Sequence, residues 1–238
     1  MVGDQIYRDF SLRTLPHRFR LRHTIRLLRR LCPMPSSYAD VGSLDGFVAD
    51  KIARALNAKH TVCFDYAEEC FAEGPKVRPR LQFRLLNLCH PDRQKKKFEL
   101  VTCLGTLEHV LDLEPAIDNL LAMTGGVLLM DVPIEIGFRG RLKFRIKKVF
   151  GQPLLSEEQG QATVQEYWQA LQSGEDISRF RQRADKREWA CHAGFDYRQI
   201  EKLLKARGVP FQSYSAGFYR YVIVRTPSLR RKDLEDGC

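Results

Sequence analysis

Tyr38-Ala-Asp-Val-Gly-Ser-Leu-Asp-Gly46, together with the apolar pattern Phe47-Val-Ala-Asp-Lys-Ile-Ala-Arg-Ala-Leu56 that follows it, decides the fold of this chain. The spacing predicts a short strand that ends at Asp40, a glycine turn, and a helix over residues 47–56. Gly42 and Gly46 can adopt positive φ and carry no Cβ, so the backbone of the turn can approach a ligand closely. Such a unit accepts ligands at the carboxyl end of its strand.

The turn is not a dinucleotide-binding fingerprint. The pattern G-x-G-x-x-G ending at Gly46 requires glycines at positions 43 and 41, where the chain has Ser43 and Val41. The spacing is instead an acid at Asp40, a gap, Gly42, and a second glycine before the helix. An ordinary glycine turn is the alternative interpretation, and the turn alone does not separate the two.

Asp65 favours a nucleoside site. It ends the apolar segment His60-Thr-Val-Cys-Phe, about 20 residues after the glycine turn. A Rossmann-like sheet places an acid there to accept hydrogen bonds from two ribose hydroxyls. A lone surface aspartate would carry no such meaning, but Asp40 and Gly42 stand upstream at the matching distance.

Three further segments continue the pattern. Residues 80–87 predict a strand that brings Asn87 to the same edge of the sheet. Residues 98–104 predict a fourth strand, which leads into Gly105-Thr-Leu-Glu-His-Val-Leu-Asp112, where Glu108 is expected to open the next helix. Residues 123–133 read as a helix end, a Gly-Gly turn and an apolar fifth strand.

In this order and spacing the segments resemble the class I methyltransferases that use S-adenosylmethionine (SAM), and Leu107-Glu-His-Val110 resembles the LEHV segment of members acting on small molecules, glycans and lipids. The resemblance covers residues 36–133 well and 191–226 loosely; Leu44 stands where the family often has glycine. It implies an α/β fold with a seven-stranded, mostly parallel Rossmann-like sheet and helices on both faces. The segments Val209 to Ser215 and Tyr219 to Thr226 predict the last two strands, as an antiparallel pair around Ala216-Gly217.

The resemblance also implies a set of SAM-binding residues. Asp65 would bind the ribose, and Asn87 with the backbone of Leu88 would read the adenine edge, although an asparagine after a strand can simply form a turn. Gly105 and Thr106 would lie beside the methionine moiety. The complete set is Asp40, Gly42, Ser43, Gly46, Asp65, Tyr66, Asn87, Leu88, Gly105 and Thr106.

The implied reaction is methyl transfer to an oxygen or nitrogen nucleophile. Because a sulfonium is a good leaving group, the protein mainly aligns donor and acceptor, and a base is needed only where the acceptor must lose a proton. Three residues are candidates for that base: Glu135, His109 and His192. A structural histidine is the alternative for His109, and a solvated loop glutamate is the alternative for Glu135.

The domain organisation follows from the same segments. Residues 1–35 are expected to be a basic, helical amino-terminal segment, and residues 36–227 the methyltransferase domain. Residues 134–190 contain several glycines and a helical pattern at 164–171, which predicts an inserted substrate lid over the carboxyl edge of the sheet. Residues 228–238 form a polar tail.

The net charge of +10 is concentrated in two acid-free stretches, Phe10 to Ala39 and Ile136 to Ser156. In both stretches, basic residues recur at helical spacing on one face and apolar residues on another. One interpretation packs the apolar face on the core and leaves the bases in solvent. Two such stretches also favour an anionic partner, which is either a membrane surface or a phosphate-bearing substrate. At a membrane, Leu21, Ile25 and Leu28 would enter the headgroup boundary.

Several other classes are disfavoured. No apolar run approaches the roughly 18 residues of a transmembrane helix, and the first residues lack a signal-peptide core. The seven cysteines form no C-x-x-C pair, so we expect no disulfide framework, no metal site and a cytoplasmic location, with peripheral membrane contact as an option. An RNA methyltransferase, for which an N-P-P-Y motif is missing, and a non-catalytic SAM-binding protein remain as alternatives. The oligomeric state is not predicted.

Overall fold

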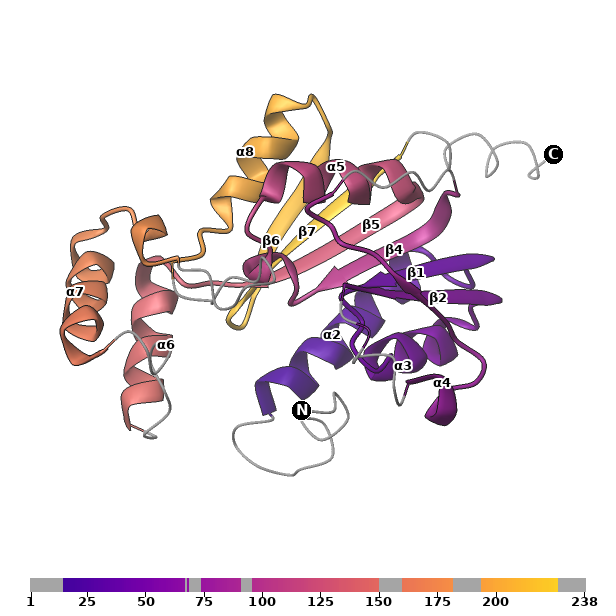
Figure 1. Ribbon diagram of the computed structural model, residues 1–238, viewed down its shortest axis with the longest axis horizontal. Coiled ribbons are helices and arrows are strands. Elements are labelled where there is room, and N and C mark those ends of the chain that lie inside the picture. Colours follow the sequence, from indigo (N-terminus) through magenta and orange to yellow (C-terminus); the bar gives the residue numbers. More distant parts are fainter. Residues whose placement is uncertain are drawn as a thin grey trace.

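The computed structural model describes residues 15–66, 68, 74–90, 96–149, 160–181 and 194–226. Its centre is a seven-stranded sheet in the order β3-β2-β1-β4-β5-β7-β6, with helices on both faces (Figure 1). The strands are β1 (Ser37–Val41), β2 (His60–Asp65), β3 (Gln82–Leu85), β4 (Phe98–Leu104), β5 (Thr124–Pro133), β6 (Phe211–Ala216) and β7 (Tyr219–Arg225). The helices are α2 (Leu15–Leu31), α3 (Phe47–Leu56), α4 (Gly74–Val77), α5 (Leu113–Met123), α6 (Gly137–Val149), α7 (Gly160–Ser173) and α8 (Arg198–Ala206), with short 3-10 turns at Leu107–His109 and Ser178–Phe180.

The strand order fixes where a ligand can enter. β1 pairs in parallel with both β2 and β4, and β4 pairs in parallel with β5. The chain therefore moves outward from β1 in one direction through β2 and β3, and then in the other through β4 and β5. In open α/β sheets ligands bind outside the carboxyl ends of the strands at this change of direction. β7 lies antiparallel between β5 and β6, so the predicted seven-stranded sheet and its final antiparallel pair are confirmed.

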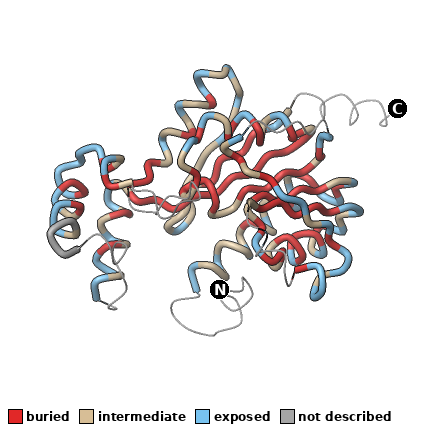
Figure 2. Tube along the Cα trace, in the orientation of Figure 1, coloured by how far each residue is buried: buried red, intermediate tan, exposed pale blue. Residues whose placement is uncertain are grey.

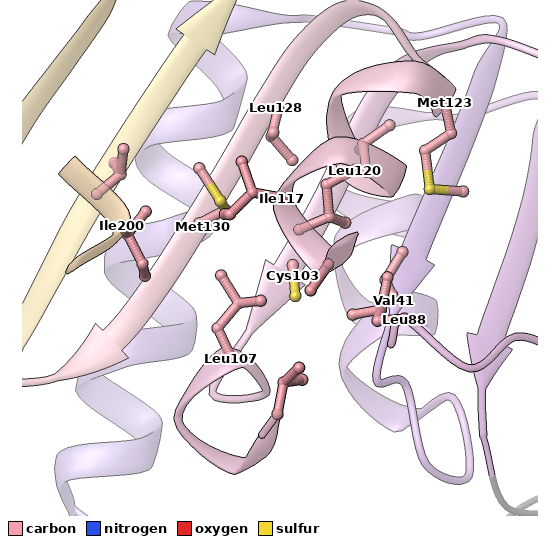
Figure 3. Packing of buried hydrophobic residues seen from close by; sticks show 14 of the residues in the cluster. Val41, Leu88, Cys103, Leu107, Ile117, Leu120, Met123, Leu128, Met130 and Ile200 are labelled. Atoms are coloured by element: carbon pink, nitrogen blue, oxygen red, sulfur yellow. The ribbon is translucent and has the colours of Figure 1, made fainter. Parts of the chain in front are cut away.

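Two apolar cores lie on opposite faces of the sheet. On one face α5 and α8 contribute Ile117, Leu120 and Ile200, which pack against the inner strands (Figure 3). On the other face α2 and α3 contribute Leu28 and Ile52. Since both faces are covered, the central strands are buried almost throughout, as Figure 2 shows.

The amino-terminal helix contradicts one expectation from the sequence. Leu28 is fully buried in the core beside α3, and Leu21 and Ile25 pack against the same cluster. They cannot enter lipid headgroups, because the apolar face of α2 is used to cover the sheet. Four arginines of this helix point to solvent instead: Arg22, Arg26, Arg29 and Arg30.

Two boundaries differ from the sequence-based expectation. β3 is only four residues long, because it is an edge strand that pairs with β2 alone and leaves most of its side chains exposed. The helix after β4 begins at Leu113, where Asp112 accepts a hydrogen bond from the Glu114 N–H. Glu108 therefore does not open that helix; it lies in the 3-10 turn and is buried.

α6 and α7 follow β5 and project beyond the end of the sheet at which β5 finishes (Figure 1). They pack on each other through Phe144, whose ring lies 4.9 Å from that of Trp168 and 6.1 Å from that of Tyr167. The helical pattern expected at 164–171 falls within α7. Among the residues that the structure describes, no helix is both long and apolar enough to cross a bilayer.

Candidate functional site

The turn between β1 and α3 has an unusual backbone. Gly42 and Gly46 both have φ of +76°, and Leu44 between them has φ of +50°. A left-handed conformation costs a residue with a Cβ about 1 to 2 kcal/mol. Three left-handed residues within five positions make a tight turn, and the surrounding contacts have to hold it.

Those contacts come from the end of β2. The carbonyl of Phe64 accepts hydrogen bonds from the N–H groups of Gly42 (2.8 Å) and Ser43 (3.1 Å). The Asp65 carboxylate accepts one from the Leu44 N–H at Oδ2 and one from the Tyr66 N–H at Oδ1, both 2.8 Å. Asp65 thus stabilises the strained turn. Each carboxylate oxygen can accept two hydrogen bonds, so these contacts leave the predicted binding of ribose hydroxyls open.

Gly42 lies directly against Thr106. A Cβ built on Gly42 would stand 2.1 Å from Thr106 Oγ1 and 2.4 Å from its methyl carbon, so no other residue fits here without displacing that side chain. Thr106 Oγ1 in turn donates to the carbonyl of Val41 (3.3 Å). The turn after β1 and the turn after β4 therefore meet, as their positions on either side of the switch point require.

Asp40 lies inside the sheet. Thr102 Oγ1 donates to Asp40 Oδ1 at 2.5 Å, and the hydroxyls of Thr102 and Tyr38 are 2.8 Å apart. Burial raises the pKa of Asp40 to about 7, although the hydrogen bond from Thr102 opposes the rise. This buried chain joins β1 to β4, so Asp40 supports the turn that follows it.

Asn87 and Leu88 follow β3 at the edge of the sheet. Asn87 Oδ1 accepts the N–H of Cys89 at 2.9 Å, which is the local turn considered as the alternative for this residue. The carbonyl of Leu88 accepts a hydrogen bond from the Asn119 side chain, also at 2.9 Å. Both residues are held in place by these bonds, and their predicted contact with adenine stays a prediction.

Three charged groups around Gly105 were not assigned to the site from the sequence. Arg20 of α2 forms an ion pair with Asp131 of β5 (3.7 Å), and a Cβ on Gly105 would lie 2.4 Å from Arg20 Nη1 and 3.5 Å from Glu108 Oε1. Burial raises the pKa of Asp131, and it raises that of Glu108 to about 8. Arg20 lies one helical turn before Thr24 and two turns before Leu28, and both of those residues are buried. Its position on the inward face of α2 was therefore the sequence signal that could have assigned it to the site.

The three candidates for the catalytic base lie in different surroundings. Glu135 is buried two residues after the end of β5 and forms an ion pair with Lys143 of α6. His109 is half-buried in the 3-10 turn after β4, and His192 lies outside the described residues. A histidine that sequence reasoning missed, His17 of α2, has its pKa lowered to about 4 by burial and by the charges of Arg20 and Lys143. It is neutral at physiological pH.

Comparisons with known proteins agree on the fold. No protein-family model matches the sequence, and no curated protein matches it. Among solved structures, the N-methyltransferase NodS from Bradyrhizobium japonicum WM9 superposes with a TM-score of 0.53 at 15% identity, covering 89% of this chain and 96% of NodS. A complex of DhpI with SAM and HEP gives 0.56 at 15% identity, covering 89% and 88%. A SAM-dependent methyltransferase from Aquifex aeolicus gives 0.55 at 10% identity, covering 88% and 92%.

These identities are low, and the similarity extends over nearly the whole of each structure. The chain has the fold of the class I SAM-dependent methyltransferases, with seven strands and helices on both faces.

Proposed function

We propose that the protein transfers a methyl group from SAM to an oxygen or nitrogen nucleophile of a small-molecule, glycan or lipid-linked acceptor. The observation that carries the proposal is the left-handed backbone of Leu44, held by Asp65 at the switch point of this fold. Strained conformations of this kind persist where the structure holds them and cluster at ligand sites. The similarity of the fold to methyltransferases supports the same conclusion.

The donor would lie along the carboxyl ends of β1, β2 and β4. Gly42, Ser43 and Gly46 of the first turn would contact it through their backbone, and Asp65 with Tyr66 would hold the ribose. Asn87 and Leu88 would contact the adenine, and Gly105 and Thr106 the methionine moiety. The contact between Gly42 and Thr106 supports this assignment, because it brings the two turns within reach of one ligand.

Bound SAM supplies an electrophilic methyl group on a sulfonium. The remaining task of the protein is to orient the acceptor and exclude water. Glu108, with a pKa of about 8, is mainly protonated at neutral pH, so its carboxyl group can donate a hydrogen bond beside Gly105. Glu135 is our first candidate for the base where one is needed, because it lies two residues after the end of β5. His109 and His192 are the others.

Two other functions compete with this one. An RNA methyltransferase is favoured by the exposed arginines of α2, which could neutralise phosphates. A non-catalytic SAM-binding protein would need the same donor site and would differ only in lacking turnover.

Label transfer tests the three functions together. The protein is incubated with methyl-labelled SAM and, in parallel, with lipid, glycan, metabolite and RNA fractions. We expect label in one of the first three, less of it with Gly42→Ala when SAM is near the wild-type Kd, and unchanged transfer with Gly208→Ala. Label in RNA alone would favour the second function. SAM binding without label in any fraction would favour the third, and absence of SAM binding would contradict the proposal.

A further inference from the structure

One side of α6 exposes a continuous apolar stripe. Phe138 is 71% exposed and Val149 81%, and between them Leu142 and Ile146 are 38% and 39% exposed. At 100° per residue these four positions share one side of the helix. The other apolar side is used differently: Phe144 is buried against Tyr167 and Trp168 of α7. The stripe therefore stays exposed on a helix whose opposite side is already packed.

Basic residues border the stripe on the side toward α7, namely Arg141, Arg145 and Lys148, and the last two are exposed. The helix contains no acid, and none occurs between residues 136 and 156. Lys143 and Lys147 point the other way, since Lys143 pairs with Glu135 and burial lowers the pKa of Lys147. α6 thus combines an exposed apolar stripe, a bordering row of positive charge and an inward face that is held by the protein.

We propose that this face of α6 docks on an anionic lipid surface, with the helix lying in the plane of the interface. Apolar side chains then enter the boundary between headgroups and acyl chains, and the nearby arginine and lysine side chains are attracted to anionic lipid. Nucleic acid fits the stripe less well. Its phosphates would contact only the arginine and lysine side chains, and its unstacked nucleobases would need aromatic side chains to stack on, whereas three of the four exposed apolar side chains are aliphatic.

The docking face lies next to the candidate site. α6 begins four residues after β5 ends, and the ion pair between Glu135 and Lys143 joins it to that strand end. The first turn of α2 lies nearby, since the charge of Lys143 lowers the pKa of His17, and its Leu15 and Phe19 are 49% and 50% exposed. Docking would bring the carboxyl edge of the sheet to the lipid. That the acceptor is lipid-linked rests on the proposed function; the docking itself does not.

Vesicle flotation tests the inference. The full chain is mixed with vesicles of phosphatidylcholine alone, or of phosphatidylcholine with phosphatidylglycerol, at low and high salt. We expect flotation with the mixed vesicles only, weakened by salt. Phe138→Ser with Val149→Ser should lower partitioning at least about tenfold, which corresponds to about 1.4 kcal/mol, because the two apolar side chains that leave water on docking are removed. The matched control is Met34→Ser with Val77→Ser, which removes side chains that are 68% and 60% exposed elsewhere; its partitioning should equal that of the wild type.

Three results would overturn the inference: no flotation with mixed vesicles at low salt, equal flotation with both vesicle types, or equal loss in the stripe variant and its control. If the protein were retained on RNA and did not float with vesicles, nucleic acid would instead be favoured as the partner of the arginine and lysine side chains of α6. SAM titration of the same variants separates this inference from the proposed function. If the protein binds SAM but does not float with vesicles, only the docking of α6 is contradicted. If it floats but does not bind SAM, only the donor site is contradicted.

Discussion

Leu44 illustrates at the scale of one residue what could and could not be predicted. Glycine permits the positive φ of Gly42 and Gly46, and the sequence predicts both residues in a turn that approaches a ligand. That Leu44 adopts the same conformation depends on a hydrogen bond to Asp65, 21 positions away in the chain. Local sequence does not contain this information, because a leucine in a turn normally avoids the left-handed region.

A pair of glycine substitutions separates a clash from backbone strain. Gly42 and Gly208 have φ of +76° and +64°, but a Cβ at Gly208 meets nothing within 4 Å, whereas one at Gly42 would overlap Thr106. We expect Gly208→Ala to cost about 1 to 2 kcal/mol of unfolding free energy and to leave SAM affinity unchanged. Gly42→Ala should cost more and weaken SAM binding at least about tenfold. Equal SAM affinity in both variants, measured by calorimetry, would show Gly42 to be only a turn residue.

Asp40 should give a measurable pH dependence of stability. Its pKa of about 7 in the folded protein lies above its ordinary value, so between about pH 4 and 7 the folded state keeps a proton that the unfolded state loses. The burial of Asp40 therefore lowers stability as pH rises through this window, and the loss levels off above it. In urea unfolding, Asp40→Asn should gain on the order of 2 to 3 kcal/mol relative to the wild type between pH 5 and 8.

Asp118→Asn is the control for this measurement. Asp118 is exposed, and a hydrogen bond from Arg207 lowers its pKa, so it titrates below the window. Its difference from the wild type should stay constant from pH 5 to 8. A constant difference for Asp40→Asn as well would mean that Asp40 is ionised in the folded protein at pH 5.

At the scale of elements, α2 and α6 show why the sequence left an alternative open. Both helices lie in an acid-free stretch in which basic and apolar residues recur at helical spacing. Leu28 of α2 is fully buried beneath the sheet, whereas Leu142 of α6 remains 38% exposed. Periodicity shows which residues share a side of a helix, but not whether another element covers that side, because this depends on the position of the helix relative to the sheet.

This difference predicts different costs for one substitution. Leu28→Ala leaves a cavity in the core and should lower the unfolding free energy by about 2 to 5 kcal/mol. Leu142→Ala removes a side chain from the surface and should change it by no more than about 0.5 kcal/mol. Urea unfolding of both variants checks the assignment. A comparable loss in both would mean that the α6 stripe packs against another part of the protein.

At the scale of the whole molecule, the architecture was predictable and the acceptor side was not. Glycine turns, apolar strands and their order identify β1 to β5 and the switch point, and the pair β6 and β7 was expected. The ion pair of Arg20 with Asp131 joins two elements that the sequence pattern treats separately. The same holds for Glu135 with Lys143. Such pairs arise from packing between helices and strand ends, for which single-sequence patterns carry little signal.

Titration of the protein with SAM tests the donor site most directly. Asp65→Ala removes the carboxylate that holds Leu44 and that would bind the ribose, and each charge-assisted hydrogen bond contributes about 1.5 to 3 kcal/mol. By calorimetry we expect the wild type to bind SAM, Asp118→Ala to bind it equally well, and Asp65→Ala to bind it about 10- to 150-fold more weakly. Unchanged SAM affinity in a folded Asp65→Ala variant, or no binding by the wild type, would contradict a SAM site at the carboxyl ends of β1, β2 and β4.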